Sequence, residues 1–390
     1  MTIRVLMLST LFPDISRPNF GVFVERQARE LASRPEAYVT VVAPIGIPPW
    51  PLSNADHYQP LTRLPEKERW RDLTVYRPRF PILPKIGGRF NVATMTRAIM
   101  PLIRRLHGER PFDVIDASFF YPDGPVAANI AKALDIPFSV KARGADIHHW
   151  GHAPATRKAV LRAGTQAAGL LAVSGAMKRS MVALGMDPDK IAVHYTGVDL
   201  DRFAIMDRAA AKSELDLAGP VVLSVGALIP RKGQDLLICA LPSLPDVTLI
   251  LIGEGPERGN LQSLAERLGV ADRVGILGAV PHDRLPQFLA AADVMALPSA
   301  SEGLANAWVE ALACGTPIVI SDVGGARELV DRPEAGRIVG REPTEIAAAV
   351  RELIDNPPDR EATRETALRF TWKANGDALL AHLQGIAGKV

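Results

Sequence analysis

Short apolar runs alternate along the chain with longer segments in which apolar residues recur at helical spacing. The first series of runs lies at residues 4–10, 38–43, 114–117, 138–142, 170–174 and 191–194. A second series lies at residues 221–225, 248–252, 274–277, 294–297 and 317–321. This alternation predicts parallel sheets joined by crossover helices. The expected fold class is therefore α/β, with two Rossmann-like, doubly wound domains.

The two series predict the domain boundaries. We expect a first domain at residues 1–198, a second at 199–368, and a C-terminal helical segment at 369–390 that follows a Phe-Thr-Trp sequence. In open α/β sheets, ligands bind beyond the carboxyl ends of the strands. Candidate site residues are therefore those that follow the apolar runs.

The stretch at residues 298–320 carries the most specific chemistry. It predicts a turn after the strand at 294–297 and then a helix from Ala305 to Ala313, with Glu302 at the strand exit and Glu310 inside the helix. The backbone N–H groups of residues 303–306 open this helix, and the positive helix end can receive a diphosphate. We interpret the stretch as a nucleotide-sugar site. Glu334 and Glu342 have the same spacing, but the sequence around them predicts neither a helix start nor a buried strand. We therefore expect these two carboxylates to be solvated.

The two glutamates form a Glu-x7-Glu motif that resembles glycosyltransferase family 4, the retaining enzymes of the GT-B fold. The resemblance implies that Glu302 faces the transferred sugar and diphosphate and that Glu310 bonds the ribose hydroxyls. Gly303, Leu304 and Asn306 would contribute to donor binding. It also implies that the two domains face a cleft and that the final helix returns to the first domain.

A loop with two cations, residues 226–235, follows the first strand of the second series. A diphosphate leaving group needs positive charge there, and arginine and lysine can supply it without a metal. Family members commonly have an arginine directly after the glycine that corresponds to Gly226, and a lysine further on. Lys232 fits the second position, but Ala227 occupies the first, so we expect Arg231 to supply the missing charge.

Two more loops of the second domain, and one of the first, match donor-binding positions of the family. Glu254 follows the strand at 248–252 and is implied to lie near the nucleotide, whereas Val280 follows the next strand, where backbone groups usually meet the base. Gly21 stands where a family glycine approaches the donor diphosphate. A dehydrogenase would have Gly-x-Gly-x-x-Gly at that first turn, and this motif is absent.

The segment after the strand at 138–142 resembles the acceptor side of the family site. Its Arg-Gly-Ala-Asp sequence is similar to an Arg-Gly-Ser-Asp variant, which makes Arg143 and Asp146 acceptor-side candidates. Further along, Ser174 is expected to cap a helix.

No metal is assigned from the sequence. The adjacent His148 and His149 have diverging side chains and no third ligand at helical spacing. The Asp-x-Asp pairs at 187–189 and 199–201 are too short a pattern to define a site. Thr196 stands where the family usually has an asparagine before the domain crossing.

Composition and charge indicate the cellular compartment and the kind of surface to expect. The chain has 390 residues and only two cysteines, which form no disulfide framework and favour a reducing cytosol. Its first apolar stretch is too short for a secretory or membrane segment. Residues 1–190 hold 26 Lys and Arg against 16 Asp and Glu, a net charge of +10, within a total of +2.

The basic residues between 63 and 110 are mixed with nine large apolar residues: Trp70, Phe80, Phe90, Met95, Ile99, Met100, Leu102, Ile103 and Leu106. This mixture fits a surface for anionic lipid or a lipid-diphosphate acceptor, and equally a solvated face over a buried stripe. No nucleic-acid-binding motif accompanies the charge.

Together these features predict a retaining, metal-independent hexosyltransferase that needs no cofactor. It would move a sugar from a nucleotide diphosphate to a hydroxyl acceptor, with bacterial surface glycan assembly on a lipid carrier, at the cytoplasmic side of the membrane, as the expected context. A GT-B nucleotide-sugar epimerase and a non-catalytic sugar-nucleotide-binding subunit remain alternatives.

Overall fold

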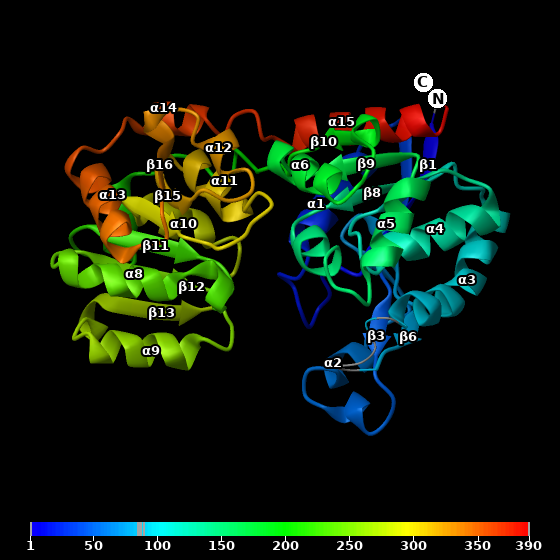
Figure 1. Ribbon diagram of the computed structural model, residues 1–390, viewed down its shortest axis with the longest axis horizontal. Coiled ribbons are helices and arrows are strands. Elements are labelled where there is room, and N and C mark those ends of the chain that lie inside the picture. The colour runs from blue at the N-terminus through cyan, green and yellow to red at the C-terminus, as the bar shows by residue number, and fades with distance from the viewer. Residues whose placement is uncertain (1, 84–87, 89, 389–390) are drawn as a thin grey trace. The chain divides into compact units, whose positions relative to one another are not determined.

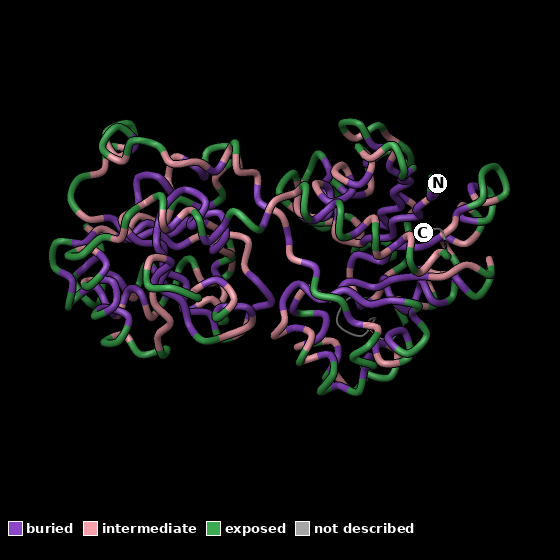
Figure 2. Tube along the Cα trace, turned by 90° about the horizontal axis from the view of Figure 1, so that it is seen from above, coloured by how far each residue is buried: buried purple, intermediate pink, exposed green. Residues whose placement is uncertain are grey.

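The computed structural model describes residues 2–83, 88 and 90–388 and divides into two compact units. The first unit holds the chain up to Gly197 together with the segment from Trp372 onward, and the second runs from Val198 to Thr371. In each unit the buried trace runs through the strands, while loops and outer helix faces are exposed (Figure 2).

The first unit is built on an eight-stranded sheet (Figure 1). Its order is β10-β9-β8-β7-β1-β2-β5-β4, and every pairing is parallel except that of β4 with β5. The chain order reverses between β1 and β7. The strands are β1 (Ile3–Leu8), β2 (Ala37–Val42), β4 (Lys67–Trp70), β5 (Leu73–Tyr76), β7 (Val114–Ala117), β8 (Phe138–Ala142), β9 (Gly169–Ala172) and β10 (Ile191–Val193).

Helices cover both faces of this sheet. They are α1 (Val22–Ala32), α3 (Asn91–Glu109), α4 (Asp123–Leu134), α5 (Arg157–Gln166), α6 (Gly175–Ala183) and α15 (Trp372–Ile386), with short turns η3 (Asp146–Trp150) and η4 (Pro188–Lys190). A smaller sheet of β3 (Ile45–Ile47) and β6 (Arg79–Pro81) adjoins η1 (Leu52–Asn54) and α2 (Gln59–Thr62). The expected cap is confirmed, because Ser174 Oγ accepts a hydrogen bond from the Met177 amide at 3.0 Å at the start of α6.

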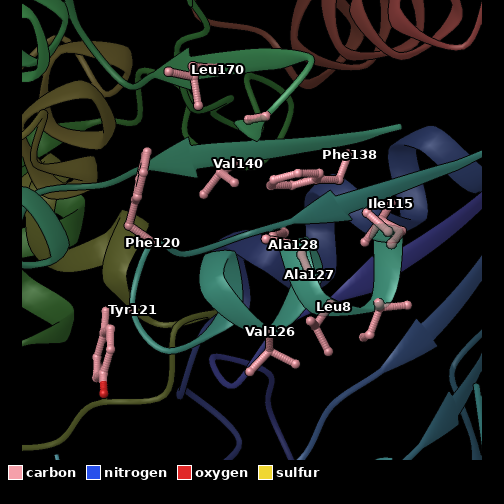
Figure 3. Close-up of a cluster of buried hydrophobic side chains, with 14 of the residues drawn as sticks. Leu8, Ile115, Phe120, Tyr121, Val126, Ala127, Ala128, Phe138, Val140 and Leu170 are labelled. Atoms are coloured by element: carbon pink, nitrogen blue, oxygen red, sulfur yellow. The ribbon is translucent and has the colours of Figure 1, made fainter. Parts of the chain in front are cut away.

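The hydrophobic core of the first unit has two parts, one on each face of the sheet. On one face, Phe138 and Val140 of β8 point toward Ala127 and Ala128 of α4 (Figure 3). On the other face, β1 and β2 pack against α1 and against Leu379 and Leu383 of α15. A strand buried on both faces has no polar alternation, which is why these strands appear in the sequence as continuous apolar runs.

The apolar stripe of α3 belongs to the core rather than to the surface. Met95, Ile99, Ile103 and Leu106 recur at helical spacing and are buried, with exposures of at most 8%. For this helix the structure therefore favours the buried-stripe alternative. Phe90, just before the helix, is 49% exposed, and Lys85 and Arg89 of the basic segment lie outside the described residues.

The second unit has a six-stranded sheet with the order β13-β12-β11-β14-β15-β16, in which every pairing is parallel. Its strands are β11 (Val221–Val225), β12 (Thr248–Ile252), β13 (Val274–Gly278), β14 (Val294–Leu297), β15 (Ile318–Ser321) and β16 (Gly336–Val339). The chain moves outward from β11 in one direction and from β14 in the other. The topological switch point therefore lies between β11 and β14.

The helices of the second unit connect these strands and cover the sheet. They are α7 (Arg208–Glu214), α8 (Gln234–Ala240), α9 (Arg258–Arg267), α10 (Leu285–Ala291), α11 (Asn306–Ala313), α12 (Ala326–Leu329), α13 (Pro343–Asp355) and α14 (Arg360–Glu365), with short turns η5 (Pro230–Lys232), η6 (Leu241–Ser243), η7 (Ala271–Arg273) and η8 (Pro333–Ala335).

One expectation about the second unit is wrong. Residues 332–343 were expected to offer neither a helix start nor a buried strand, yet α13 begins at Pro343 with Glu342 as its N-cap residue, and β16 pairs in parallel with β15 over four residues. It is an edge strand in which only Gly336 is buried and the other three residues are half-buried, so it lacks the apolar run by which the inner strands are recognised.

The chain passes from the first unit to the second at Gly197 and returns at Trp372. Val198 pairs with Thr371 as an isolated bridge, and the Val198 amide donates to the Phe370 carbonyl at 2.6 Å. A side chain at Gly197 would collide with Trp372, whose ring and backbone lie 2.6–2.7 Å from the position of a Cβ. Among the described residues, no helix is both long and apolar enough to span a bilayer.

Candidate functional site

The loops that follow β11 and β14 meet at the switch point of the second unit. The two strands are direct neighbours, with Val222 opposite Val294, so their carboxyl ends open side by side. The Ala300 amide donates a 2.7 Å hydrogen bond to the carbonyl of Arg231, which joins the two loops. This edge of the sheet is where an open α/β fold binds its ligand.

Three of the predicted residues form one ion-pair cluster at this edge. Lys232 Nζ lies 2.6 Å from Glu302 Oε1, and Arg231 Nη1 lies 3.3 Å from the same oxygen. The Glu302 and Lys232 side chains are only 9% and 13% exposed, whereas Arg231 is 42% exposed and also donates to the Ser301 carbonyl. The cluster holds two cations and one carboxylate, so it retains positive charge for an anionic ligand.

Glycines allow this close approach of the loops. Gly233 has a φ of +72°, a left-handed conformation that favours glycine, and a Cβ there would collide with the Pro298 carbonyl. At Gly226 a Cβ would meet the aliphatic stem of Lys232 at 3.5–3.6 Å. The lysine stem therefore lies across Gly226 on its way to Glu302.

The start of α11 lies beside the cluster. Gly303 and Leu304 are buried and Asn306 is half-buried. Ala305 is the N-cap residue and makes no capping hydrogen bond with its side chain, so no N-cap side chain satisfies the first-turn amides of α11. The helix begins at Asn306, one residue later than predicted.

Glu310, in the second turn of α11, is paired with a histidine that the sequence did not indicate. His282 Nε2 lies 2.9 Å from Glu310 Oε1, and the two side chains are 24% and 11% exposed. His282 comes from the turn between β13 and α10, and its ring meets the buried Phe203 edge-on at 5.4 Å.

The loops after β12 and β13 continue the same edge of the sheet. The Leu228 amide donates to the Glu254 carbonyl at 2.8 Å, and the Gly253 amide donates to the Gly278 carbonyl at 2.8 Å. The Glu254 side chain is exposed and Val280 is half-buried. The predicted donor-binding residues of the second unit thus follow four neighbouring strands.

Gly21, Arg143 and Asp146 belong to the first unit. Gly21 precedes α1 with a φ of +70°, and a Cβ there would lie 2.6 Å from the backbone of Leu11, so this turn requires glycine without any ligand. Arg143 Nε donates to the Ser118 carbonyl at 2.7 Å, and its guanidinium lies 4.6 Å above the ring of Phe23.

The carboxylate of Asp146 is enclosed by backbone donors. It accepts hydrogen bonds from the amides of Phe120, Arg143, Gly144 and Ile147 at 2.7–3.2 Å. Burial raises its pKa, and these amides act in the opposite direction. In the described structure Asp146 therefore organises the turn that carries Arg143.

Two family models match the chain. One, described as Glycosyl transferases group 1, covers residues 206–370, and the other, described as Glycosyltransferase Family 4, covers residues 21–202. The GDP-mannose-dependent alpha-(1-6)-phosphatidylinositol monomannoside mannosyltransferase of Mycolicibacterium smegmatis is 37% identical over 257 residues, which cover 60% of this chain and 67% of that protein. The chain belongs to glycosyltransferase family 4.

Other similar proteins agree with this membership. The putative teichuronic acid biosynthesis glycosyltransferase TuaC of Bacillus subtilis is 28% identical over 357 residues, which cover 89% of this chain and 88% of that protein. The chain spans about half the length of the D-inositol 3-phosphate glycosyltransferases that it also matches. Sucrose-phosphate synthase from Thermosynechococcus elongatus superposes over the whole of both chains with a TM-score of 0.84 at 19% identity. The GT-B fold class is thereby confirmed.

This family 4 glycosyltransferase departs from the family pattern at Ala227, which is exposed. The Ala227 carbonyl accepts a 3.1 Å hydrogen bond from the side-chain Nε2 of Gln234, which helps to hold the loop. Arg231, the predicted substitute, reaches the carboxylate of Glu302 from the other end of the same loop.

A buried polar network in the first unit was missed by sequence reasoning. Lys141 Nζ lies 3.2 Å from Gln27 Oε1 and 2.8 Å from His194 Nδ1, and Gln27 also reaches Asp116 at 3.4 Å. Burial lowers the pKa of Lys141 well below its usual value and raises that of Asp116 to about 6. A lysine inside a fully buried strand, β8, was the sequence signal for this network.

The described residues contain no group of three or more His, Cys, Asp or Glu side chains placed to hold a metal ion.

Proposed function

We propose that this family 4 glycosyltransferase transfers a sugar from a nucleotide diphosphate donor to a hydroxyl acceptor with retention at the anomeric carbon. The observation that carries the proposal is the ion-pair cluster of Lys232, Arg231 and Glu302 at the switch point, next to the start of α11. A site of this kind suits a ligand that combines a diphosphate with a sugar.

The cluster would act mainly by electrostatic stabilisation. As the bond between the anomeric carbon and the diphosphate oxygen breaks, negative charge grows on the leaving phosphate, and the two cations lie where they can offset it. The acceptor oxygen bonds to the same face of the anomeric carbon, and its proton passes to the leaving phosphate. Because Lys232 already neutralises Glu302 at 2.6 Å, we assign Glu302 to positioning the sugar and not to nucleophilic attack.

The same charges support a reaction without a metal. Lys232, Arg231 and the start of α11 would together supply positive charge at the same edge of the sheet, which is the role that a divalent cation has in other diphosphate chemistry. We therefore assign no metal or cofactor to this reaction.

The nucleotide would be held by the neighbouring loops. Glu310 would accept hydrogen bonds from the ribose, Glu254 would lie near the nucleotide, and the backbone near Val280 would meet the base. Recognition of a base through main-chain groups leaves no mark on the side chains, so the side chains do not identify the base. The name of the Mycolicibacterium relative supports a donor with guanine.

The acceptor would be a lipid-linked or polysaccharide intermediate, bound by the first unit near Arg143 and Asp146. The names of the two relatives, which concern a phosphatidylinositol mannoside and teichuronic acid, support this class. The net charge of +10 on residues 1–190 and the 78% exposed Trp50 support peripheral association with the cytoplasmic face of a membrane.

A thermal-shift panel with UDP, GDP, ADP and CDP tests the donor site. One nucleotide should stabilise the wild-type protein, by roughly 2.7 kcal/mol at about 100 times its dissociation constant. Glu310→Ala should lose that shift, and Glu334→Ala, the matched substitution in the second glutamate pair, should keep it. The matching sugar nucleotide is then incubated with acceptor extracts, and NMR of the product gives the anomeric configuration.

The outcomes separate the candidate activities. An α-linked product from an α-linked donor supports retention, and inversion contradicts it. Release of an epimer without acceptor identifies the epimerase alternative. Donor binding without turnover identifies a non-catalytic subunit. This alternative stays open because Ala227 stands where the family usually has a positively charged arginine.

A further inference from the structure

His282 lies next to Glu310, the residue proposed to bind the ribose, and the family motifs assign it no role. Its Nε2 atom is 2.9 Å from Glu310 Oε1, and the carboxylate is only 11% exposed. Among the described residues, His282 is the only side chain that donates a hydrogen bond to Glu310. An ionised carboxylate can only accept, so His282 Nε2 must carry the hydrogen in this pair.

The imidazole is itself held in place from two directions. It occupies the turn between β13 and α10, where the Arg284 amide donates to the Pro281 carbonyl at 2.8 Å. Its ring meets Phe203 edge-on at 5.4 Å, with an angle of 71° between the rings. Phe203 is fully buried, so it gives the imidazole a rigid surface.

Phe203 is tied to the same helix that carries Glu310. Arg364 Nη1 donates to the Phe203 carbonyl at 2.6 Å and also to the carbonyl of Ala313, the last residue of α11. The histidine, the phenylalanine and the glutamate therefore share one frame built on α11. In such a frame the position of one carboxylate oxygen is fixed before any ligand arrives.

We propose that His282 is a positioning residue for the ribose of the donor. It fixes Glu310 Oε1 so that the other carboxylate oxygen is directed to the ribose hydroxyls, which strengthens donor binding by preorganisation. This inference rests on the proposed function, because it assumes that Glu310 binds ribose.

The test compares two polar variants of matched chemistry. His282→Gln places an amide N–H close to the position of Nε2, whereas His282→Asn is one methylene shorter and does not reach Glu310. Two ligands are compared. The first is the nucleotide of the UDP, GDP, ADP and CDP panel that binds the wild type, and the second is the 2′,3′-dideoxy analogue of that nucleotide. Calorimetry gives the dissociation constant of each ligand.

The expected readout is the preference for ribose. His282→Asn should weaken binding of the ribonucleotide about tenfold and leave the dideoxy analogue within about twofold, because the analogue has no hydroxyls for Glu310 to bind. His282→Gln should retain the ribonucleotide affinity within about threefold. Equal losses for both ligands, or equal behaviour of the two variants, would overturn the inference.

Two further variants keep the result interpretable. If His282→Asn does not fold, His282→Phe replaces it, since it preserves the edge contact with Phe203 but has no N–H. If Glu310→Ala retains the preference for ribose, the ribose role in the proposed function is itself wrong. If Glu310→Ala loses the preference and the His282 variants keep it, only the positioning role fails.

Discussion

At the scale of single residues, Glu302 and Lys232 depend on each other. Both side chains are nearly buried, and an ion pair of this kind leaves an uncompensated charge when one partner is removed. Arg231 is more exposed and lies farther from the carboxylate, so it can compensate only in part. The catalytic contribution of the cluster should therefore depend mainly on the lysine.

Replacing Lys232 with methionine should lower the rate constant of transfer by roughly 10²- to 10³-fold, because a preorganised positive charge beside the leaving phosphate is lost. Steady-state kinetics with the sugar nucleotide found in the panel would measure this. Binding of the nucleoside diphosphate should weaken more than binding of the monophosphate, which has no second phosphate to contact.

Lys132→Met serves as the control for this prediction, since Lys132 belongs to α4 of the first unit, outside the cluster. Full turnover by Lys232→Met, or equal losses for the di- and monophosphate, would show that charge at this position does not stabilise the leaving group.

The sequence could indicate the site residues that directly follow predicted strands. It could not indicate residues that contact them only after folding. Glu302, Glu310 and Lys232 stand at fixed spacings from apolar runs, and those spacings survive in the fold. His282 lies 28 positions from Glu310 in a turn of its own, and no local pattern links the two. Asp146 was predicted as an acceptor-side residue from its motif, and the four amides around it could not be foreseen.

At the scale of elements, the short turn η5 and the strand β14 have to meet closely for the cluster to form. Gly233, directly after η5, allows this meeting through its left-handed conformation and its missing side chain. Backbone geometry at one glycine thus determines where Lys232 can reach.

Gly233→Ala should destabilise the protein by roughly 1–3 kcal/mol, because it combines a strained positive φ with a collision against the Pro298 carbonyl. Urea unfolding would measure the change. Donor binding should also weaken, since the loop must move away from Glu302.

Gly259→Ala is a control with the opposite expected sign. Gly259 lies inside α9, and no atom lies within 4 Å of the position of a Cβ, so alanine should stabilise the helix by about 0.4–1 kcal/mol. If the two variants changed stability alike, the conformational argument for Gly233 would be wrong.

Strands were predictable where they contain an apolar run, which includes the edge strands β10 and β13, and not where they lack one. β7, β8, β11, β12 and β14 have the bounds that the apolar runs predicted. β4 and β5 form an antiparallel pair at the edge of the first sheet, and the Lys-Glu-Arg-Trp sequence of β4 has no apolar run. The edge strand β16 was missed for the same reason. Burial leaves an apolar run in the sequence, whereas strands such as β4 and β16 form through backbone pairing, which local sequence does not record.

At the scale of the whole molecule, the sequence predicted two parallel-sheet domains but not the order of their strands. Alternating strands and helices fix the parallel direction, whereas the order depends on which side of β1 or β11 each later strand is added. The reversal between β11 and β14, which places Lys232 beside Glu302, became evident only in the fold. The C-terminal helix α15 closes the first unit by packing on α1, as the family resemblance implied.

The attachment of α15 should depend on pH through His382. Its Nε2 atom lies 2.7 Å from Ser139 Oγ on β8, and burial lowers its pKa from 6.5 to about 4. A histidine with a lowered pKa binds fewer protons in the folded state than in the unfolded state, so stability is lost as the pH falls from 6.5 toward 4. Burial raises the pKa of Asp116 to about 6 and that of Asp123 to about 7, and these carboxyls act in the opposite direction.

Because these effects oppose each other, the difference between wild type and His382→Gln is the informative quantity. Between pH 7 and pH 5, the wild type should lose roughly 2 kcal/mol more of its free energy of unfolding than the variant, which has no imidazole to protonate. Urea unfolding at the two pH values measures this, with the exposed His152→Gln as a control that should keep the wild-type slope. A slope unchanged by His382→Gln would mean that α15 stays attached independently of this histidine. In that case the apolar contacts of Leu379 and Leu383 would be what holds the end of the chain on the first unit.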